Sequence, residues 1–424
     1  MSKASPYTKT NDLINLEGKY ELVDTLGGGT DAMREAGTTY LPREPGETSE
    51  NYTRRLERSV LFPAYTNAVV TNTAKIFRNG MEVENSTPLL DPFLNNIDEE
   101  GNGMQVFAQR ACEKAVDYGC SYILVDYPVV TPNSTLADEK AAGVQPYWIL
   151  IEAPQVLEAS PIRINGKNKL GIFRFVEQHA FRADEFSIAY QERVKEFRIM
   201  EDGTVMYRVF IQQNDDWVLY DEGTLLGLTE IPVAPMYTKK VGFYLGSPMM
   251  YELATENVLN FQMTSDYLNL IHMSQVPMLQ VVGATSSFDD SGVKNEIVIS
   301  PNTVLEFNNP DAEASWIEIS GSAAAVGRLA LQDSMERMSE LSMEALTNSV
   351  VDQTATASLL DAEESVSMMQ TLQFNVEQSI NEAIRYTYKY LGIDNDATTV
   401  SLTIAEPIED TEINSPVTQI TAVQ

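Results

Sequence analysis

The sequence predicts a mixed α+β fold with long helices in its last third, and three observations carry this prediction. Three stretches of the C-terminal half repeat apolar residues every three or four positions, which is the spacing of amphipathic helices. The middle third holds short runs rich in aromatic and β-branched residues between turn residues, which is typical of strands. Hydrophobic residues make up 43% of the 424 positions and charged residues 21%, which excludes wholesale disorder and a chain built only from coiled coils.

The N-terminal third is predicted to be an arm followed by helices. Turn residues are frequent in the first fifty positions, so we expect an arm rich in turns up to about residue 45. A capping residue followed by an acid at Thr48-Ser49-Glu50 predicts a helix start, and that helix is expected to reach residue 61. A second helix is expected to end at Gly80, and a third is predicted over residues 104–118, ended by Gly119. The apolar faces assigned to these helices are made by Tyr52, Leu56, Val60, Leu61, Val69, Val70, Ile76, Val106, Phe107, Ala111, Ala115 and Val116.

The middle third is predicted to be rich in strands. Two apolar runs, residues 122–125 and 147–151, are short enough to be buried strands. The polar stretch 131–143 between them is expected to be an exposed loop. Glu201-Asp202-Gly203 is typical of a hairpin turn. Further strands are predicted at residues 173–177, 197–200, 205–212 and 217–220.

Three long helices are predicted in the C-terminal part. The first is expected to begin at Ser247-Pro248, with Ser247 as its cap, and to end before Pro277. Strands are expected in the segment that follows, at 278–282, 296–299 and 304–307, and near the C-terminus at 400–404. The second helix begins after Ser320-Gly321-Ser322, with an apolar face of Val326, Leu329, Met335, Met338 and Leu341. The third helix covers about residues 356–391, with an apolar face of Leu359, Ala362, Val366, Met369, Leu372, Val376, Ile380, Ala383 and Thr387. Such rods need neighbours to cover their apolar faces, and other copies of the chain can supply them.

The charge balance limits the classes of function that the chain can have. The chain has 29 Lys and Arg against 61 Asp and Glu, a net charge of −32. A protein that binds nucleic acid tightly neutralises phosphates with basic surface. The charge balance therefore argues against a sequence-reading DNA binder, but it does not exclude a protein that DNA slides past. Cys112 and Cys120 lack the spacing of a zinc site, and a reducing compartment is expected. We also expect no signal peptide, no membrane span and a protein made in a cytoplasm.

No set of residues suggests catalysis, a metal or a cofactor. Gly27-Gly28-Gly29 lacks the lysine of a phosphate-binding loop and is predicted to be a flexible turn. His179 and His272 have no matching nucleophile and acid. The acidic turn from Asp98 to Gly103 lacks the distal glutamate of a calcium loop. Adjacent glutamates such as Glu363-Glu364 point in different directions on a helix, so they form no acid–base pair. One cluster of basic residues is expected to be solvated or to form ion pairs between subunits, rather than to contact nucleic acid: Arg54, Arg55, Arg58, Lys75 and Arg78.

The order of these parts resembles that of the portal proteins of tailed bacteriophages, in a branch described as a domain of unknown function. The matching pieces are spread over about residues 40–390: Tyr40-Leu41-Pro42 before Tyr52, Arg55 and Arg58; Ile76-Phe77-Arg78; Ile97-Asp98 and Gly101; Ile123 to Pro128; Gln145-Pro146-Tyr147; and Gln353 to Ala357. The resemblance implies a non-enzymatic ring, usually of twelve copies, at one vertex of the capsid. The ring would conduct double-stranded DNA without sequence specificity during packaging and ejection.

The resemblance also implies a division of the chain. It assigns residues 1–45 to an N-terminal arm, 46–245 to an α/β wing, 246–276 to a first stem helix, 277–320 to a clip, 321–345 to a second stem helix, 346–357 to a tunnel loop, 358–392 to a long wing helix and 393–424 to a short acidic crown or tail. Only about 30 residues follow Leu391, so a large helical crown is not expected.

The same resemblance implies site residues and partners. The tunnel loop would face the DNA channel with Asn348, Ser349, Asp352, Gln353 and Thr354. The clip would dock the motor and then the adaptor with Asp289, Asp290, Lys294 and Asn295. The implied partners are further copies of the chain, DNA, the terminase motor, the major capsid protein, scaffold and the head-to-tail adaptor. The implied location is the virion, after assembly in the cytoplasm of a bacterial host.

Two other classes of function remain open on the sequence. A soluble acidic enzyme or nucleotide-binding protein would use the loop at Gly27–Gly29 and would be a monomer or small oligomer. Another virion assembly protein, such as a capsid or adaptor subunit, is the third class. The order of long helix, small β segment and long helix favours the portal class over a capsid subunit.

Overall fold

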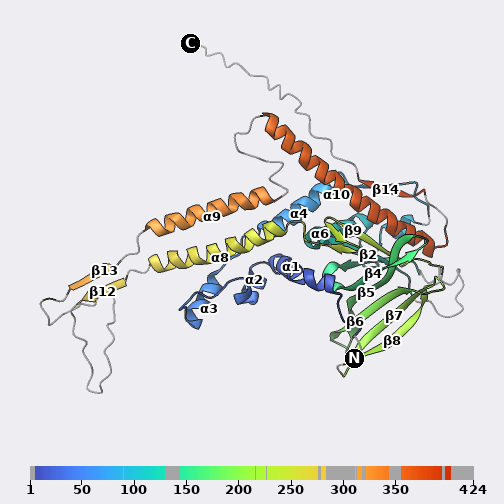
Figure 1. Ribbon diagram of the computed structural model, residues 1–424, viewed down its shortest axis with the longest axis horizontal. Helices are drawn as coiled ribbons and strands as arrows, with labels where there is room; N and C mark the ends of the chain where they lie inside the picture. The colour runs from blue at the N-terminus through green and yellow to red at the C-terminus, as the bar shows by residue number, and fades with distance from the viewer. Residues whose placement is uncertain are drawn as a thin grey trace, which may run out of the picture. The chain divides into compact units, whose positions relative to one another are not determined.

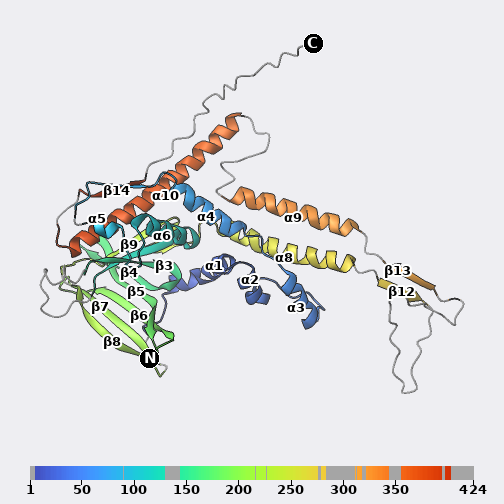
Figure 2. The same ribbon diagram turned by 180° about the vertical axis from the view of Figure 1, so that it is seen from behind.

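The chain folds into two compact units, which are described separately here (Figures 1 and 2). The computed structural model describes residues 5–88, 90–128, 144–214, 216–225, 227–275, 278–282, 311, 313–317, 321–342, 355–393 and 397–402. Unit 1 takes its described residues from 1–27, 64–254 and 340–424, and unit 2 from 28–63 and 255–339. Residues 46–63 therefore lie in unit 2, while the domain boundaries implied by the resemblance stay predictions.

Helices and strands are both abundant, so the predicted mixed α+β class is confirmed. The helices are α1 (Asn11–Gly27), α2 (Gly29–Ala36), η1 (Gly37–Thr39), α3 (Ser49–Arg58), α4 (Ala64–Ile76), α5 (Asp91–Leu94), α6 (Met104–Tyr118), η2 (Ala153–Gln155), α8 (Tyr251–Ser274), α9 (Gly321–Leu341) and α10 (Ala355–Tyr390). The strands are β1 (Met81–Glu84), β2 (Cys120–Asp126), β3 (Tyr147–Glu152), β4 (Val156–Ile164), β5 (Lys167–Arg182), β6 (Ile188–Ile199), β7 (Val205–Gln213), β8 (Asp216–Leu225), β9 (Val233–Tyr237), β10 (Lys240–Gly242), β11 (Leu245–Gly246), β12 (Met278–Val282), β13 (Glu313–Ile317) and β14 (Thr399–Leu402).

The centre of unit 1 is a three-stranded antiparallel sheet in the order β3-β2-β9, covered on both faces (Figure 1). Successive side chains of a strand point to opposite faces, and β2 shows both environments. Ser121 donates a hydrogen bond to the carbonyl of Ala111 in α6, whereas the ring of Tyr122 packs edge-to-face on Phe173 of β5. Every residue of β2 is consequently buried, as the continuous apolar run predicts.

The C-terminal helix α10 packs against β2 and β9 of this sheet and beside α4 and α6 (Figure 2). Of its predicted apolar face, the residues with described side chains from Leu372 onward are buried: Leu372, Val376, Ile380, Ala383 and Thr387. Thr387 also accepts a hydrogen bond of 2.9 Å from the indole nitrogen of Trp148 on β3. The predicted helix and this half of its face are confirmed.

The second sheet of unit 1 is a five-stranded antiparallel meander, β4-β5-β6-β7-β8. All four strands predicted between residues 173 and 220 belong to it. The predicted hairpin turn joins β6 to β7, with Gly203 at a φ of 84° that favours glycine. Asp202 closes the turn because its carboxylate accepts hydrogen bonds from the backbone and the hydroxyl of Thr204.

A row of alternating charges crosses all five strands of this sheet. The pairing register places these residues opposite one another in turn: Glu158, Arg174, Glu196, Arg208 and Glu222. Glu196 is buried in the middle of the row and forms ion pairs with Arg174 and Arg208 on the neighbouring strands. Arg174 pairs in addition with Glu158, at 3.0 Å. A buried carboxylate is stable only when it is paired in this way.

Helix α8 begins four residues later than predicted, because Ser247 is used for another purpose. The backbone of Ser247 crosses that of Gly119 so closely that a Cβ on Gly119 would lie 2.1 Å from the Ser247 carbonyl oxygen. Gly119 also has a φ of 83°, in the left-handed region. The Ser247 amide donates to the carbonyl of Lys239. Ser247 therefore closes a backbone crossing, and the helix starts at Tyr251.

The expectation of a turn-rich arm is wrong for residues 11–36, which form α1 and α2. Apolar side chains recur every three or four positions in α1 and are buried: Leu13, Leu16, Tyr20, Val23 and Leu26. The run Gly27-Gly28-Gly29 does separate two elements, as predicted, since α1 ends at Gly27 and α2 begins at Gly29. The apolar spacing of α1 therefore outweighs the nearby turn residues.

Other differences from the predicted elements are local. Helix α3 ends at Arg58, so Val60 and Leu61 lie beyond it, and the only residue it buries is Arg55. Val70 and Val106 were assigned to apolar faces but are exposed. Strand β12 was predicted, but its antiparallel partner β13 was not. Strand β14 confirms the predicted C-terminal strand and pairs with β1. The expected loop 131–143 and the expected strands at 296–299 and 304–307 lie outside the described residues.

Candidate functional site

Unit 2 contains two long helices, α8 and α9, that meet through polar side chains. The amide of Asn260 on α8 donates to the hydroxyl of Ser334 on α9, at 3.2 Å. Ser334 in turn donates to Glu256, at 2.8 Å, and Arg337 pairs with the same carboxylate at 3.0 Å. Asn260 and Ser334 are both buried. Because each buried polar group has a partner, the contact fixes the register of the two helices.

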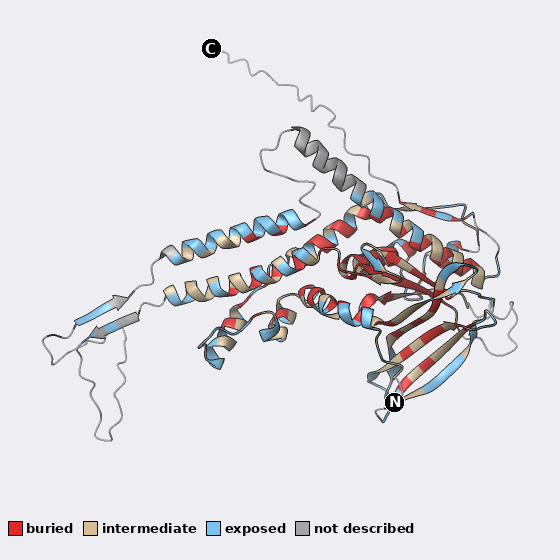
Figure 3. Ribbon diagram, in the orientation of Figure 1, coloured by how far each residue is buried: buried red, intermediate tan, exposed pale blue. Residues whose placement is uncertain are grey.

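The predicted apolar face of α9 is for the most part not covered by the chain itself. Val326 is 67% exposed and Leu329 55% exposed, and Met335 and Leu341 are exposed as well. Only Met338 of the five predicted residues is buried. In Figure 3, α9 is accordingly mostly pale blue. The residues that α9 turns toward α8 are small or polar instead: a Cβ on Gly327 would lie 3.0 Å from the ring of Tyr267.

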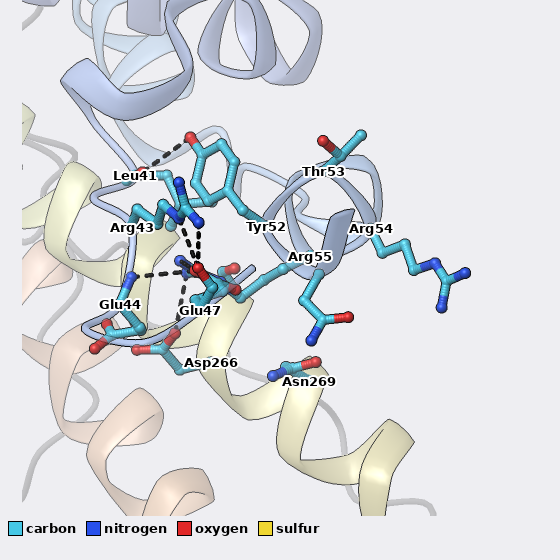
Figure 4. Close-up of polar contacts among 12 residues, drawn as sticks. Leu41, Arg43, Glu44, Glu47, Tyr52, Thr53, Arg54, Arg55, Asp266 and Asn269 are labelled. Atoms are coloured by element: carbon cyan, nitrogen blue, oxygen red, sulfur yellow. Dashed lines mark hydrogen bonds and ion pairs between the residues drawn. The ribbon is translucent and has the colours of Figure 1, made fainter. Parts of the chain in front are cut away.

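A buried arginine ties α3 to the loop before it and to α8 (Figure 4). Arg55 is 3% exposed, and its guanidinium grips Glu47 through two bonds, Nε–Oε1 at 2.9 Å and Nη2–Oε2 at 3.0 Å. The same group donates to the carbonyl of Pro42 at 2.8 Å and pairs with Asp266 of α8 at 3.3 Å. A fork-shaped guanidinium suits this arrangement because it offers several donors in one plane. Arg55 therefore has a structural role.

The pKa values of the two carboxylates that pair with Arg55 shift in opposite directions. The hydrogen bonds from Arg55 hold the pKa of Glu47 below its ordinary value, so this group stays ionised. Partial burial raises the pKa of Asp266, and the positive charge of Arg55 only partly opposes that effect. The bidentate partner Glu47 is thus the stronger of the two ion pairs.

A groove of about 640 Å³ runs beside this cluster within unit 2. It is lined by Glu44, Pro45, Gly46, Glu47, Asn51, Arg54, Arg55, Arg58, Asp266, Asn269, Leu270, His272 and Met273. Arg54 pairs with Glu50 at the surface, at 2.7 Å. Nη1 of Arg58 is buried and has no hydrogen-bond partner among the described residues. Basic and acidic groups are balanced along the groove, so it does not resemble a site that attracts nucleic acid.

The basic cluster predicted from the sequence is divided between the two units. Arg54, Arg55 and Arg58 are on α3 in unit 2, whereas Lys75 and Arg78 belong to unit 1. Arg54 and Arg55 form ion pairs with acids of the same chain, and the expected pairing between subunits stays a prediction. Sequence reasoning missed that Arg55 is buried, since its partner Asp266 lies 211 positions further along the chain.

The acidic turn before α6 is closed by its own hydrogen bonds. The carboxylate of Asp98 accepts bonds from the backbone of Glu100 and Asn102 and from the Asn102 amide. Partial burial acts to raise the pKa of Asp98, but these hydrogen bonds outweigh it and lower the pKa. The oxygens that a cation would need are therefore occupied by the turn itself.

The residues predicted for the channel and the clip are outside the described part of the chain. These residues are Asn348, Ser349, Asp352, Gln353 and Thr354 of the tunnel loop, and Asp289, Asp290, Lys294 and Asn295 of the clip.

Cys112 and Cys120 are buried free thiols, and burial raises the pKa of each to about 12. Among the described residues no group of three or more His, Cys, Asp or Glu side chains is placed to hold a metal ion. Nor does any described helix combine the length and the apolar character of a membrane span.

Residues 249–391 match the model of a protein family whose description is "domain of unknown function" (DUF4055). The matched region covers about a third of the chain and runs from two residues before α8 to the residue after α10. The search of curated proteins found no match to the sequence. The family model therefore marks α8, β12, β13, α9 and α10 as a recurring group of elements, without assigning them an activity.

Proposed function

We propose that the protein is the subunit of a portal-type ring that conducts double-stranded DNA at one vertex of a bacteriophage capsid. The observation that carries the proposal is the outer face of α9. Val326 and Leu329 project from a long helix with more than half of each side chain exposed, while α9 meets α8 through polar and small residues. A helix with this distribution gains stability when a neighbouring subunit covers its apolar side.

The order of elements supports the same proposal. Two long helices, α8 and α9, are joined through a segment that contains the antiparallel pair β12 and β13. In the proposed ring, α8 and α9 are the stem, the segment with β12 and β13 is the clip, unit 1 supplies the wing, and α10 is the long wing helix. The clip would dock the terminase motor and then the adaptor, and the wing would face the capsid protein and the scaffold.

The net negative charge of the chain suits a channel that DNA passes through better than a protein that binds DNA tightly. With −32 per copy, a ring of many copies repels the phosphate backbone and forms few lasting contacts with it. DNA can then move through without the counterion release that makes binders hold tightly. This reasoning involves no catalytic group, and the proposed role is that of a structural protein.

The deciding experiment is the native mass of the purified protein by light scattering, followed by negative-stain images. We expect a closed ring with a central hole, and twelve copies of the 47.2 kDa chain would weigh about 570 kDa. A monomer whose thermal stability rises on adding a nucleotide would overturn the proposal and favour the nucleotide-binding alternative. A large particle without a central hole would favour another assembly protein.

Paired variants test whether the exposed apolar face of α9 contacts a neighbouring subunit. Leu329→Asp places a charge on the outer face of α9 and is expected to shift the ring toward monomers, with little change in monomer stability because the side chain is exposed. Val241→Asp is the matched control, since Val241 is also exposed but lies on β10 in unit 1. Equal ring yields for both variants and the unchanged protein would contradict the role given to α9.

The predicted tunnel loop has its own test. Asp352→Lys exchanges a repelling charge for one that attracts phosphate, so DNA passage during packaging is expected to slow or stop while rings still form. Asp352→Asn is the control that removes the charge without reversing it. Unchanged packaging with the lysine variant would remove this residue from the channel.

A further inference from the structure

The hairpin between β5 and β6 in unit 1 carries large apolar side chains into solvent. Phe186 in the turn is 92% exposed, and Ile188 and Tyr190 at the start of β6 are 61% and 69% exposed. Single exposed apolar residues are ordinary, but several that adjoin one another mark interaction surfaces. Figure 3 shows this end of the sheet with much of its surface exposed.

Two of these side chains share one face of the five-stranded sheet. Ile188 and Tyr190 are two residues apart on β6, so they point to the same side, as does Glu192 two residues further on. Tyr7 connects Glu192 to β8, because its hydroxyl lies 3.5 Å from that carboxylate and its ring stacks on Trp217 at 5.5 Å. Leu219, two residues after Trp217, is exposed on the same face. We call Phe186, Ile188 and Tyr190 the tip patch.

The turn that presents Phe186 is internally fixed. The carboxylate of Asp184 accepts hydrogen bonds from the backbone of Phe186 and Ser187, both at 2.8 Å, and from the Ser187 hydroxyl at 2.7 Å. Arg182 donates to the carbonyl of Glu185 across the same turn, at 2.9 Å. A turn held by four bonds presents its aromatic side chain with little loss of freedom on binding, which favours recognition.

The charges around the tip patch are mostly negative. Three acids, Asp184, Glu185 and Glu192, and one arginine, Arg182, lie in the turn and the strand ends around it. An anionic lipid surface would be repelled by this rim. A second copy that presented the same patch would bring two acidic rims together, which is also unfavourable. Charge complementarity therefore selects an occupant that is basic and apolar.

We propose that the tip patch docks a basic segment of another protein, whose apolar side chains cover Phe186, Ile188 and Tyr190 while its Lys or Arg residues meet the acidic rim. Exposed aromatic residues are the usual anchors of such contacts. This inference concerns a surface of unit 1 and does not depend on whether the chain forms a ring.

The test uses the full-length protein and two synthetic peptides of equal length and charge. One alternates Leu and Lys, and the other alternates Ser and Lys. Because any acidic protein attracts Lys, the serine peptide measures binding by charge alone, and the difference between the peptides isolates the apolar contribution. We expect the leucine peptide to bind more tightly and to protect the amides of residues 181–192 from hydrogen exchange.

A triple variant, Phe186→Ser, Ile188→Thr and Tyr190→Thr, should weaken the leucine peptide about tenfold or more and leave the serine peptide unchanged. Thr preserves strand preference at both positions of β6. Val241→Thr, at an exposed residue of β10, is the matched control and should bind both peptides as the unchanged protein does. Circular dichroism and the Tm check that each variant is folded.

Three results would overturn the proposal. The first is equal leucine-peptide affinity for the triple variant and the unchanged protein. The second is binding of the unchanged protein, but not the triple variant, to vesicles of phosphatidylcholine and phosphatidylglycerol, which would make the patch a membrane contact. The third is a change in native mass caused by the triple variant alone, which would mean that a second copy covers the patch.

Discussion

The two units differ in what fills their interiors. In unit 1, helices and two sheets enclose large apolar side chains such as Trp148, Tyr122 and Phe173, each at most 1% exposed. In the described part of unit 2, five apolar residues are buried, namely Met33, Leu41, Leu61, Phe261 and Met338, against six polar or charged ones, namely Arg55, Ser59, Asn257, Asn260, Ser265 and Ser334. The interior of unit 2 is therefore held largely by specific hydrogen bonds and ion pairs.

This difference bears on stability. Full burial of a large apolar side chain contributes about 1.5–3 kcal/mol, whereas a hydrogen bond contributes about 1 kcal/mol net. Unit 2 consequently has less intrinsic stability for its length than unit 1, but its polar pairs fix geometry. A helical element that is well defined and weakly stabilised suits a subunit that is completed by its neighbours. The following variants test the comparison, from the largest expected effect to the smallest.

Trp148→Ala tests the apolar interior of unit 1. The ring packs edge-to-face on Phe93 and Phe107, and its nitrogen donates to Thr387. Removing it should lower the free energy of unfolding by about 3–5 kcal/mol, measured by urea denaturation. Phe374→Ala, at an exposed position of α10, should cost less than about 0.5 kcal/mol. Similar losses for both would refute an apolar core centred on Trp148.

Arg55→Ala tests the polar interior of unit 2. Glu47 would be left poorly hydrated and without its partner, so a loss of about 3 kcal/mol is expected. The loss should be local, with faster hydrogen exchange in residues 40–62 and 255–275 and little change in unit 1. Arg54→Ala removes a surface ion pair and should cost at most about 0.5 kcal/mol. Equal exchange rates in the two variants would show that Arg55 is not a structural anchor.

Glu230→Gln tests an ionic cluster within unit 1 through its pH dependence. Partial burial acts to raise the pKa of Glu230, but hydrogen bonds from Lys169, Lys389 and Arg385 outweigh it and lower the pKa to about 2. The ionised carboxylate therefore stabilises the fold above its unfolded pKa of about 4.3, and this contribution is lost as the pH falls toward 2.

The unchanged protein should accordingly lose about 2 kcal/mol between about pH 5 and pH 2 that Glu230→Gln does not lose. Urea denaturation at a series of pH values measures the difference. Glu222→Gln, at an exposed position of β8, is the control and should retain the acid-dependent loss. Parallel pH profiles for the unchanged protein and Glu230→Gln would contradict the assigned cluster.

Ser334→Ala gives the smallest expected effect and separates polar pairing from packing in unit 2. Alone it leaves the buried amide of Asn260 without its acceptor and should cost about 1 kcal/mol. Combined with Asn260→Leu, the loss should largely disappear, because an apolar pair replaces both partners. A double variant as unstable as the sum of the two single changes would mean that the two residues act independently, which would contradict a stabilising hydrogen bond between them.

The sequence allowed the elements with strong periodicity to be predicted, and the reasons for the failures are specific. The buried strand β2 and the inner face of α10 follow from apolar spacing alone. Helix α1 was not predicted because turn residues are frequent in the first fifty positions, although the apolar spacing of residues 13–26 is regular. Ser247 resembles a helix cap, and only the distant Gly119 shows that its backbone is engaged elsewhere.

The candidate site was less predictable than the fold. Arg55 looks like a surface residue of a polar helix, because no pattern near it in the sequence predicts its ion pair with Asp266. The apolar spacing of α9 was visible, but spacing cannot say whether a face is covered by the same chain or left exposed. The channel and clip residues stay predictions that the variants proposed above can test.

The row of charges across the five-stranded sheet has a consequence for how that sheet forms. A shift of two residues between β6 and β7 would place Glu196 opposite Met206 or Phe210 instead of Arg208, and the buried carboxylate would lose a counterion. A shift of one residue would turn the whole row to the other face. The row therefore favours a single alignment of β5, β6 and β7 in the folded sheet, because Glu196 meets Arg174 and Arg208 in that register.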